Sequence, residues 1–395
     1  MSQAPPAVAP TVAWDADPAL PVWDGLPALD GTVSADACVV GLGGSGLAAV
    51  EELVDRGLSV VGIDAGRVAA GAAGRNGGIL SAGGALLRSG AATLSPELRH
   101  DLYRACLAEL ARLAEQLGDV IIKSVGTLRL AGLPGEPADD AEAADRTREL
   151  EDLVTEAAVL RSWGVAIEDY DGELGRGFYN PDTAGTNPVH RAYGLAARLT
   201  SRTRLFEHTA ATAVHAGGVE TSRGRIRART VIVAVDGKLP QLVPQLASLA
   251  RTVRLQMLAT APIAPRRLPC PTGFHNGYEW AQQDEAGRLF VGGGRDKFLQ
   301  QEFTTDDEPT APVQAWISTV AARLAAQPVT VTHRWAASVS YTDDYRALVV
   351  LLDEGVAACG GYSGSGNLVG PVAARAAVAL AVDGTTPPSY FRSSL

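Results

Sequence analysis

A glycine-rich hexapeptide near the N-terminus has the residue types and spacing of a phosphate-binding turn. Gly41, Gly43 and Gly46 fit the pattern GxGxxG. The first glycine permits a tight turn, the second lets the backbone approach a pyrophosphate, and the third lets a helix pack closely on the preceding strand. The N–H groups at the start of that helix then face the phosphates. Taken alone the motif is weak evidence, because glycine-rich turns occur in many α/β proteins.

Asp64 adds a second sign of nucleotide binding. It lies 23 residues after Gly41, at the end of the next apolar segment. A carboxylate at this place can accept hydrogen bonds from both hydroxyls of a ribose, whereas an arginine would indicate a 2′-phosphate. Together, the turn and the carboxylate predict a dinucleotide that carries adenosine, and they do not separate NAD from FAD.

The segments around the turn have the patterns of a βαβ unit. The apolar run at 37–41 predicts a strand that is buried on both faces. Apolar positions at helical spacing predict a helix over about 45–56, which Gly57 ends, and a second strand follows at 58–64. A strand, glycine turn, helix and strand within some thirty residues make a βαβ unit. We therefore expect a doubly wound domain.

Further along the chain, helices and strands alternate with an antiparallel block. Helical patterns cover 95–118 and about 138–163, and strand patterns cover 125–131 and 229–237. The block at 251–335 is typical of antiparallel strands, with a hairpin turn at 284–287. The C-terminal part again has the order strand, glycine turn, helix.

The composition of the 395-residue chain excludes several classes of protein. An apolar fraction of 46% is enough for a large core, which excludes a disordered chain. The net charge of −10 argues against nucleic acid as a partner. Four widely separated cysteines without a CxxC pair, and six histidines without ligand spacing, predict neither a disulfide framework nor a metal site.

No segment has the character of a secretion signal or a membrane span. Residues 1–14 lack both basic residues and an apolar centre. The most apolar late stretch, at 368–382, is too short to cross a membrane and contains Arg375. We expect a soluble, cytoplasmic protein.

The segment GAAGRNGG, at 71–78, separates the two dinucleotides. A backbone with so few side chains suggests a loop that lies against a flat cofactor ring. From 41 to 78 the sequence resembles the start of the D-amino-acid-oxidase-like flavoprotein superfamily, and GRNGG is most similar to the gamma-glutamylputrescine oxidase-like branch. The segments at 213–244, 276–294 and 359–368 resemble the second cofactor-contacting strand pair, the substrate-domain hairpin and the glycine turn beneath the flavin. The resemblance covers about 14–385.

This resemblance implies a fold, a cofactor and a reaction. The fold is α/β (α+β overall): a doubly wound Rossmann-like FAD-binding domain with an antiparallel-sheet substrate domain, as in glutathione-reductase-type flavoproteins with two dinucleotide-binding domains. The cofactor is FAD, bound non-covalently. The reaction is oxidation of a small amine or amino acid (a CH–NH or CH–NH2 donor) by hydride transfer to flavin N5, which gives an imine and, with oxygen as acceptor, hydrogen peroxide.

The order of the segments predicts two domains that are each discontinuous in sequence. Residues 1–35 form an irregular N-terminal arm, which Trp14 and Trp23 hold to the body. The FAD-binding domain comprises 36–117, 186–250 and 338–390, and the substrate-binding domain comprises 118–185 and 251–337.

The residues implied to contact FAD lie in the glycine turn, after the second strand, in the GRNGG loop, in the later strand pair and in the closing turn. They are Gly41, Gly43, Gly44, Ser45, Gly46, Asp64, Ala65, Arg67, Ala72, Ala73, Gly74, Arg75, Asn76, Gly77, Gly78, Val214, Ala234, Gly237, Gly361, Gly364, Ser365, Gly366, Asn367 and Leu368.

The substrate pocket has weaker signals. Tyr278 and Trp280 share one face of a strand by the period of two, and with Tyr341 they are candidates for an aromatic wall, although ordinary core packing explains them equally well. Arg295 and Arg346 are candidates to bind a substrate carboxylate.

No catalytic acid or base is singled out, because the flavin carries most of the chemistry. Among the three lysines, only Lys297 lies in a segment that approaches the expected flavin ring, so it is the candidate for oxygen activation.

Two departures from the branch affect the expected substrate pocket. Ser365 stands where the branch commonly has histidine, and Ala347 where its last-strand turn has proline. They weaken the transfer of a specific substrate.

Three alternatives stay open. The first is a flavin dehydrogenase that uses a quinone or an electron carrier, and the second is a non-catalytic FAD-binding subunit. The third, a flavin monooxygenase, would need a Gly-Asp pair at the late turn, which reads Gly360-Gly361-Tyr362.

Overall fold

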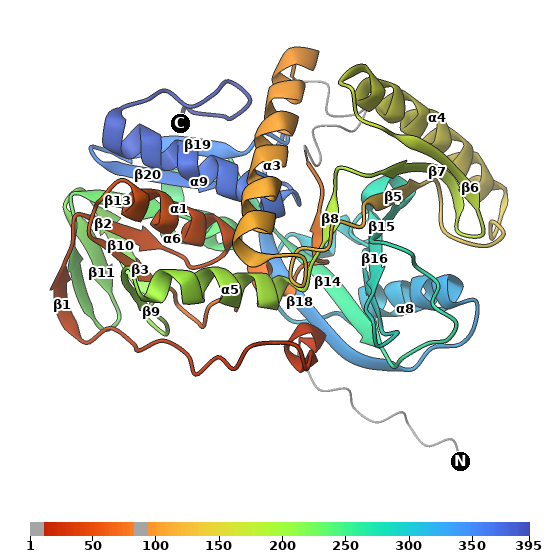
Figure 1. Ribbon diagram of the computed structural model, residues 1–395, viewed down its shortest axis with the longest axis horizontal. Coiled ribbons are helices and arrows are strands. Elements are labelled where there is room, and N and C mark those ends of the chain that lie inside the picture. Colours follow the sequence, from red (N-terminus) through yellow and green to blue (C-terminus); the bar gives the residue numbers. More distant parts are fainter. Residues whose placement is uncertain (1–11, 83–93) are drawn as a thin grey trace.

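The computed structural model describes residues 12–82 and 94–395. Two large sheets dominate it, and a layer of long helices covers the first of them (Figure 1). The first sheet has six strands, in the order β19 (Leu348–Asp353), β20 (Val356–Gly360), β13 (Thr230–Val233), β2 (Ala37–Val40), β3 (Val60–Ile63) and β9 (Arg204–Phe206). All neighbours in it are parallel except β19 and β20.

Both faces of the six-stranded sheet are covered. Along β2, Ala37 and Val39 pack in one apolar cluster, and Cys38 and Val40 pack in another, as expected for a central parallel strand. On the first face α1 (Gly44–Asp55) and α9 (Gly366–Asp383) pack against the strands, and α5 (Pro188–Thr200) and α3 (Pro96–Leu117) pack against these helices. The second carries a four-stranded sheet of β1 (Gly31–Ser34), β12 (Gly224–Arg227), β11 (Gly218–Thr221) and β10 (Ala211–His215), with α6 (Leu239–Leu242).

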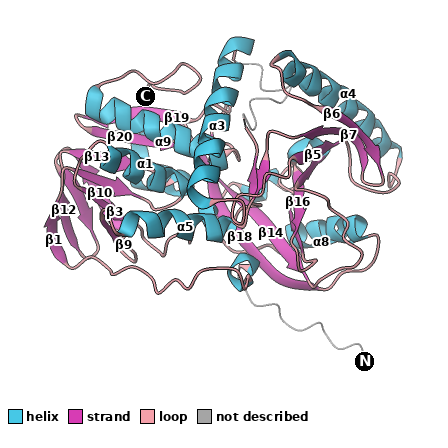
Figure 2. Ribbon diagram, viewed as in Figure 1, coloured by secondary structure: helices cyan, strands magenta, loops and turns pink. Residues whose placement is uncertain are grey.

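The second large sheet has eight strands (Figure 2). Their order is β18 (Val331–Tyr341), β14 (Arg251–Thr260), β17 (Leu289–Gly292), β16 (Glu279–Gln283), β15 (Thr272–Phe274), β5 (Thr127–Leu130), β7 (Gly175–Asn180) and β6 (Glu168–Gly172). Only β15 and β5 pair in parallel. Helices α8 (Ala311–Ala325) and α4 (Asp140–Ser162) pack on this sheet.

The remaining elements are short. Strands β4 (Ile79–Leu80) and β8 (Ala184–Gly185) form a two-stranded sheet, and α2 (Ala72–Arg75) and α7 (Leu299–Glu302) are single turns. The 3-10 turns are η1 (Ala13–Ala16), η4 (Asp236–Lys238), η5 (Pro244–Leu246) and η6 (His275–Gly277).

The block at 251–335, predicted as strands, also contains the helix α8 at Ala311–Ala325, whose buried Val313, Ile317, Val320 and Leu324 recur at helical spacing. Three further differences concern short segments. The N-terminal arm is not wholly irregular, because β1 pairs with β12. The GRNGG loop contains the turn α2, and Asn276 belongs to η6, whose left-handed backbone delays the start of β16 to Glu279. Each miss has a physical cause: β1 is stabilised by pairing with a distant strand, and the two turns depend on local backbone angles rather than on hydrophobic period.

The predicted division into domains can be compared with the two large sheets. Strands of the six-stranded sheet come from 37–63, 204–233 and 348–360, and strands of the eight-stranded sheet come from 127–180 and 251–341. The predicted boundary at 337/338 falls inside β18, which pairs with β14 along its length. We propose that the boundary lies after β18.

The arm is held by its tryptophans. The Trp14 indole stacks on Phe290 with ring centroids 3.6 Å apart, and its N–H donates to the Asn76 carbonyl at 2.9 Å. The Trp23 ring stacks on Tyr193 at 4.8 Å, and its N–H donates to Glu207 at 3.1 Å. The arm therefore contacts both the loop after β3 and the eight-stranded sheet.

We predict that Gly46→Ala destabilises the protein. A Cβ at position 46 would lie 1.7 Å from the Gly41 carbonyl oxygen, so α1 would have to move away from β2. Overpacking of this kind costs about 1–3 kcal/mol of unfolding free energy. Denaturant unfolding of the apoprotein measures it. Gly71→Ala is the matched control, because nothing lies within 4 Å of a Cβ there; equal losses for both variants would contradict the prediction.

Asp236 joins the two large sheets. Its carboxylate accepts the N–H groups of Ser340 at the end of β18 (3.2 Å) and of Gly361 after β20 (2.9 Å). Burial raises the pKa of this carboxyl to about 6, against the effect of those backbone donors.

The Asp236 carboxyl sets a pH dependence of stability. The folded protein holds its proton more tightly than the unfolded chain, whose pKa is about 3.8. The stabilisation is therefore complete below that value and is lost as the pH rises to about 6, at about 1.4 kcal/mol per pH unit. We predict that the unfolding free energy of the wild type falls relative to that of Asp236→Asn across this window. Parallel curves for the two proteins between pH 4 and pH 7 would contradict it.

Candidate functional site

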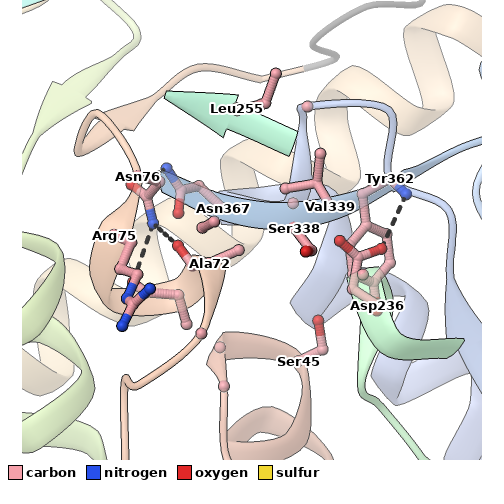
Figure 3. A pocket seen from close by; sticks show the side chains of 18 of the residues that line it. Ser45, Ala72, Arg75, Asn76, Asp236, Leu255, Ser338, Val339, Tyr362 and Asn367 are labelled. Carbon is pink, nitrogen blue, oxygen red and sulfur yellow. Dashed lines mark hydrogen bonds between the residues drawn. The ribbon is translucent and has the colours of Figure 1, made fainter. Parts of the chain in front are cut away.

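A cavity of about 620 Å³ lies between the two large sheets. It extends from Asp64 at the end of β3, past the turn between β2 and α1, to the face of β16 and β5. Figure 3 shows part of it: Ser45 points into it from the start of α1, Asn76 and Asn367 lie together on one side, and Asp236 and Tyr362 lie on the other. We call this space the main cavity.

The glycine turn forms one wall of the main cavity. Gly41 has φ +98°, and a Cβ there would lie 2.6 Å from the Ala234 carbonyl oxygen, so only glycine suits this turn. Helix α1 begins after Gly43 without a side-chain cap. The N–H groups of its first turn are therefore available to an anion, and the helix dipole favours one.

Asp64 is held at the nucleotide end of the cavity. One carboxylate oxygen accepts the Leu42 N–H at 2.8 Å, and the other accepts the Gly66 N–H at 2.9 Å. Burial raises its pKa, which these two donors partly offset. The carboxylate fixes the glycine turn and keeps further lone pairs for a ribose.

Arg191 is a buried cation beside the same turn. It is 3% exposed, lies on α5 and lines the main cavity, and a Cβ on Gly44 would lie 3.5 Å from its guanidinium. Its hydrogen bonds run to the side chain (2.8 Å) and the backbone carbonyl (3.3 Å) of Asn367, and it makes no ion pair within the described ranges. Burial lowers its pKa to about 10, so it stays charged at neutral pH and suits a phosphate.

The loop at 71–78 is fixed by its own side chains. The Asn76 amide donates to the Ala72 and Ala73 carbonyls, and its oxygen accepts the Gly78 N–H at 2.8 Å and the Asn367 amide at 3.1 Å (Figure 3). This network orders a segment that carries few side chains of its own. It leaves a backbone surface against which a flat ring can lie.

The closing turn after β20 forms the floor of the cavity near Asp236. The Tyr362 hydroxyl donates to Cys359 Sγ at 3.3 Å, and burial raises the pKa of that thiol to about 12. Cys359 is buried and is not among the lining residues, so it is a poor candidate for covalent attachment of a cofactor.

The opposite wall carries the predicted aromatic residues. Tyr278, Trp280 and Tyr341 all line the main cavity. The guanidinium of Arg295 lies 5.4 Å from the Tyr278 ring centroid and 4.5 Å from that of Tyr341, and it also lines the cavity. Four of the five predicted pocket residues are thus together on one wall.

Arg346 and Lys297 do not line the main cavity. Arg346 pairs with Asp344 at 2.8 Å and contacts the Ser389 carbonyl. The Lys297 ammonium lies over the Trp316 ring at 4.3 Å from its centroid. The lysine that lines the cavity is Lys238, which donates to Thr305, Asp307 and Ser338.

Most of the residues implied to contact FAD line the main cavity. They are Gly41, Gly43, Gly44, Ser45, Asp64, Ala65, Ala72, Ala73, Arg75, Asn76, Gly77, Ala234, Gly237, Gly364, Gly366 and Asn367.

The others lie behind the cavity wall or on neighbouring surfaces. They are Gly46, Arg67, Gly74, Gly78, Val214, Gly361, Ser365 and Leu368. Two of them support the wall: a Cβ on Gly74 would meet the Ala69 carbonyl, and one on Gly78 the Thr186 carbonyl. Arg67 pairs with Asp15 of the arm, and Ser365 lines an adjacent cavity of about 90 Å³.

Sequence reasoning missed several lining residues. Besides Arg191, Lys238 and Asp236, they include Arg129 on β5 and Gly273 on β15. Ala211 and Thr212 line the cavity on the strand for which Val214 was proposed. A bulge between Ala211 and Ala213 interrupts the period of two in β10, and Ala211 and Val214 pack against the same apolar cluster, so the period does not tell which residues of this strand reach the cavity.

A cluster of acidic residues and one histidine lies beside the aromatic wall. His275 contacts Glu279 at 2.8 Å and Glu149 at 3.3 Å, and these, with Asp296, are the ligand types of a metal site. The sequence spacing had indicated no such group. Burial lowers the pKa of His275, but the hydrogen bond and charge of Glu279 outweigh this effect and raise the pKa overall, which favours the charged imidazole beside these carboxylates.

The cavity fits FAD by its donor groups and shape. Free N–H groups and the buried Arg191 guanidinium suit the pyrophosphate, Asp64 suits the ribose, and the small-residue loop suits a flat ring.

In the ranges 12–82 and 94–395, no helix has both the length and the apolar character needed to cross a membrane.

Comparison with known proteins agrees with this geometry. The model of the FAD dependent oxidoreductase family, DAO, matches residues 36–380. A probable oxidoreductase, OrdL, from Rhizobium meliloti is 25% identical over 384 residues, which cover 91% of this chain and 86% of that protein.

Solved structures show the same fold. Glycine oxidase from Geobacillus kaustophilus superposes with a TM-score of 0.70 at 20% identity, covering 89% of this chain and 95% of the other. L-proline dehydrogenase from P. horikoshii gives 0.68 at 17% identity, covering 92% and 96%. The superfamily resemblance noted in the sequence is thereby confirmed: this chain belongs to the DAO family of FAD-dependent oxidoreductases.

Proposed function

We propose that this protein binds FAD non-covalently and oxidises a small amine or amino acid to an imine, with oxygen as the electron acceptor and hydrogen peroxide as the second product. The observation that carries this proposal is the continuity of the main cavity, which runs from the nucleotide end at Asp64 to a wall of Arg295 and aromatic side chains. FAD, when bound, supplies the two-electron acceptor.

The chain's own residues bind and orient the substrate. Arg295 offers a planar set of N–H donors to a carboxylate, and the flanking rings of Tyr278 and Tyr341 restrict its position. Trp280 presents an apolar surface that excludes water from the amine-bearing carbon. An unprotonated amine is oxidised more readily in such a site, because desolvation disfavours the ammonium form.

The electron acceptor is a separate matter from the electron donor. Among the structural neighbours, one is named an oxidase and another a dehydrogenase, and a shared fold does not choose between them. Lys238 lies at the cavity and is the lysine best placed to act with oxygen. The dehydrogenase alternative differs only in the oxidant.

We predict that the purified protein is yellow and that an amine or amino acid bleaches its flavin band under anaerobic conditions. The panel consists of amino acids, N-methyl amino acids and polyamine derivatives. Admission of oxygen then restores the band with release of hydrogen peroxide. Restoration only by an artificial acceptor would replace the oxidase with the dehydrogenase. A yellow protein that no member bleaches would favour the non-catalytic alternative.

We predict that Arg295→Gln raises the apparent Kd of amino-acid substrates, and of carboxylate inhibitors, by roughly 10- to 100-fold. This range corresponds to the loss of charge-assisted hydrogen bonds worth about 1.5–3 kcal/mol. Perturbation of the flavin spectrum by carboxylates measures it. Arg346→Gln is the matched control, because Arg346 pairs with Asp344 away from the cavity. An unchanged Kd in Arg295→Gln, or an equal rise in both variants, would remove the assignment.

A further inference from the structure

A row of paired residues crosses the eight-stranded sheet on the side of the main cavity. Strand pairing joins Arg129 of β5 to Gly273 of β15, Gly273 to Trp280 of β16, and Trp280 to Gly292 of β17. Directly paired residues share one face of a sheet. Two glycines therefore alternate with two large side chains, and the glycines leave space on that face.

The Trp280 ring fills the space beside Gly292, whereas the Arg129 side chain lies over Gly273 at ordinary van der Waals distance. The Trp280 indole leans over Gly292, where an added Cβ would lie 2.4 Å from the ring, and also against Gly77 of the loop at 2.5 Å. At Gly273 an added Cβ would make only an ordinary contact, 3.5 Å from Cδ of Arg129. Both Gly273 and Arg129 line the main cavity. The row thus forms a recess between Trp280 and Arg129.

Two guanidinium groups therefore face this end of the cavity from opposite sides of Trp280. Arg295 lies against Tyr278 and Tyr341, beyond the end of β17, and makes no ion pair among the residues that the structure describes. Arg129 has one carboxylate nearby, Glu156 of α4, at 3.5 Å from one terminal nitrogen. That single long contact leaves most of its five N–H donors for another acceptor.

The carboxylates that line the main cavity are engaged elsewhere. Asp64 accepts the Leu42 and Gly66 N–H groups at the nucleotide end, and Asp236 accepts the N–H groups of Ser340 and Gly361. Asp307 pairs with Lys238 at 3.0 Å. The wall around Trp280 consequently carries Arg295, which is in no ion pair among the described residues, and Arg129, whose charge only the long contact to Glu156 offsets.

We propose that the substrate is an amino acid with a second carboxylate, one carboxylate bound by Arg295 and the other by Arg129 in the recess beside Gly273. This inference rests on the proposed function and narrows its substrate class. Three strand spacings, about 14 Å, separate the backbones of β17, which leads to Arg295, and β5, which carries Arg129. A short aliphatic chain between the two carboxylates fits this separation once the arginine side chains extend inward.

The test measures binding without turnover. The wild-type holoenzyme is titrated with glutarate and with butyrate, which differ by one carboxylate and contain no amine, and the change in the flavin spectrum gives each Kd. We expect glutarate to bind at least 10-fold more tightly than butyrate. We expect Arg129→Gln to lose this preference and Arg129→Lys to keep part of it, since lysine retains the charge without the planar fork.

Arg176→Gln is the matched control for the arginine substitutions. Arg176 lies on the neighbouring strand β7, and its side chain is 65% exposed and pairs with Asp171. This variant should keep the wild-type preference. FAD content and thermal melting of each variant show whether it folds. If Arg129→Gln does not fold, the preference of the wild type for glutarate and its partial retention in Arg129→Lys still test the second carboxylate site.

The outcomes separate this inference from the proposed function. Equal binding of glutarate and butyrate to the wild type, or an undiminished preference in Arg129→Gln, overturns the second carboxylate site and leaves amine oxidation standing. A preference for glutarate that depends on Arg129, in a protein whose flavin no amine bleaches, supports the two-cation recess and removes the proposed reaction. Faster anaerobic bleaching of the flavin by glutamate or aspartate than by alanine supports both the amine oxidation and the second carboxylate site.

Discussion

Backbone segments that touch without intervening side chains determine the shape of this cavity. At the first such contact α1 approaches β2 so closely that one methyl group on Gly46 would overlap the Gly41 carbonyl. At another, Gly237 lies against the Ser338 carbonyl, where the six-stranded sheet meets β18. Protein interiors are closely packed with few voids, so each contact fixes the separation of the elements on either side. The position of every lining side chain follows from these separations.

The two ends of the cavity carry positively charged groups that suit a phosphate at one end and a carboxylate at the other. The nucleotide end combines a helix N-terminus and the buried Arg191 with a carboxylate, Asp64, that backbone donors already hold. The opposite end has Arg295 against two aromatic rings. Glu109 favours the charge of Arg191 without contacting it in an ion pair, and a buried guanidinium of this kind suits a phosphate group as a direct partner.

Local sequence was sufficient for the glycine turn and for much of the aromatic wall. Gly41, Gly46 and Asp64 act through a single βαβ unit. Tyr278 and Trp280 both line the cavity, but only Trp280 lies in β16, because Tyr278 ends η6 with helical backbone angles. Arg129 and Arg191 were missed because their roles depend on neighbours that are distant in the sequence. The pairing of β5 with β15, and the packing of α5 against the glycine turn, bring them to the cavity, and no local pattern encodes either.

The contacts of the N-terminal arm bear on how the chain is completed during synthesis. Trp14 emerges early from the ribosome, but its stacking partner Phe290 and the Arg191–Asn367 pair beside the cofactor site involve residues made much later. The strands of the six-stranded sheet likewise include β19 and β20, near the C-terminus. The βαβ unit can therefore gain these contacts only when nearly the whole chain has been made. A truncated chain would lack the closing turn, and cofactor capture belongs to the last stage of assembly.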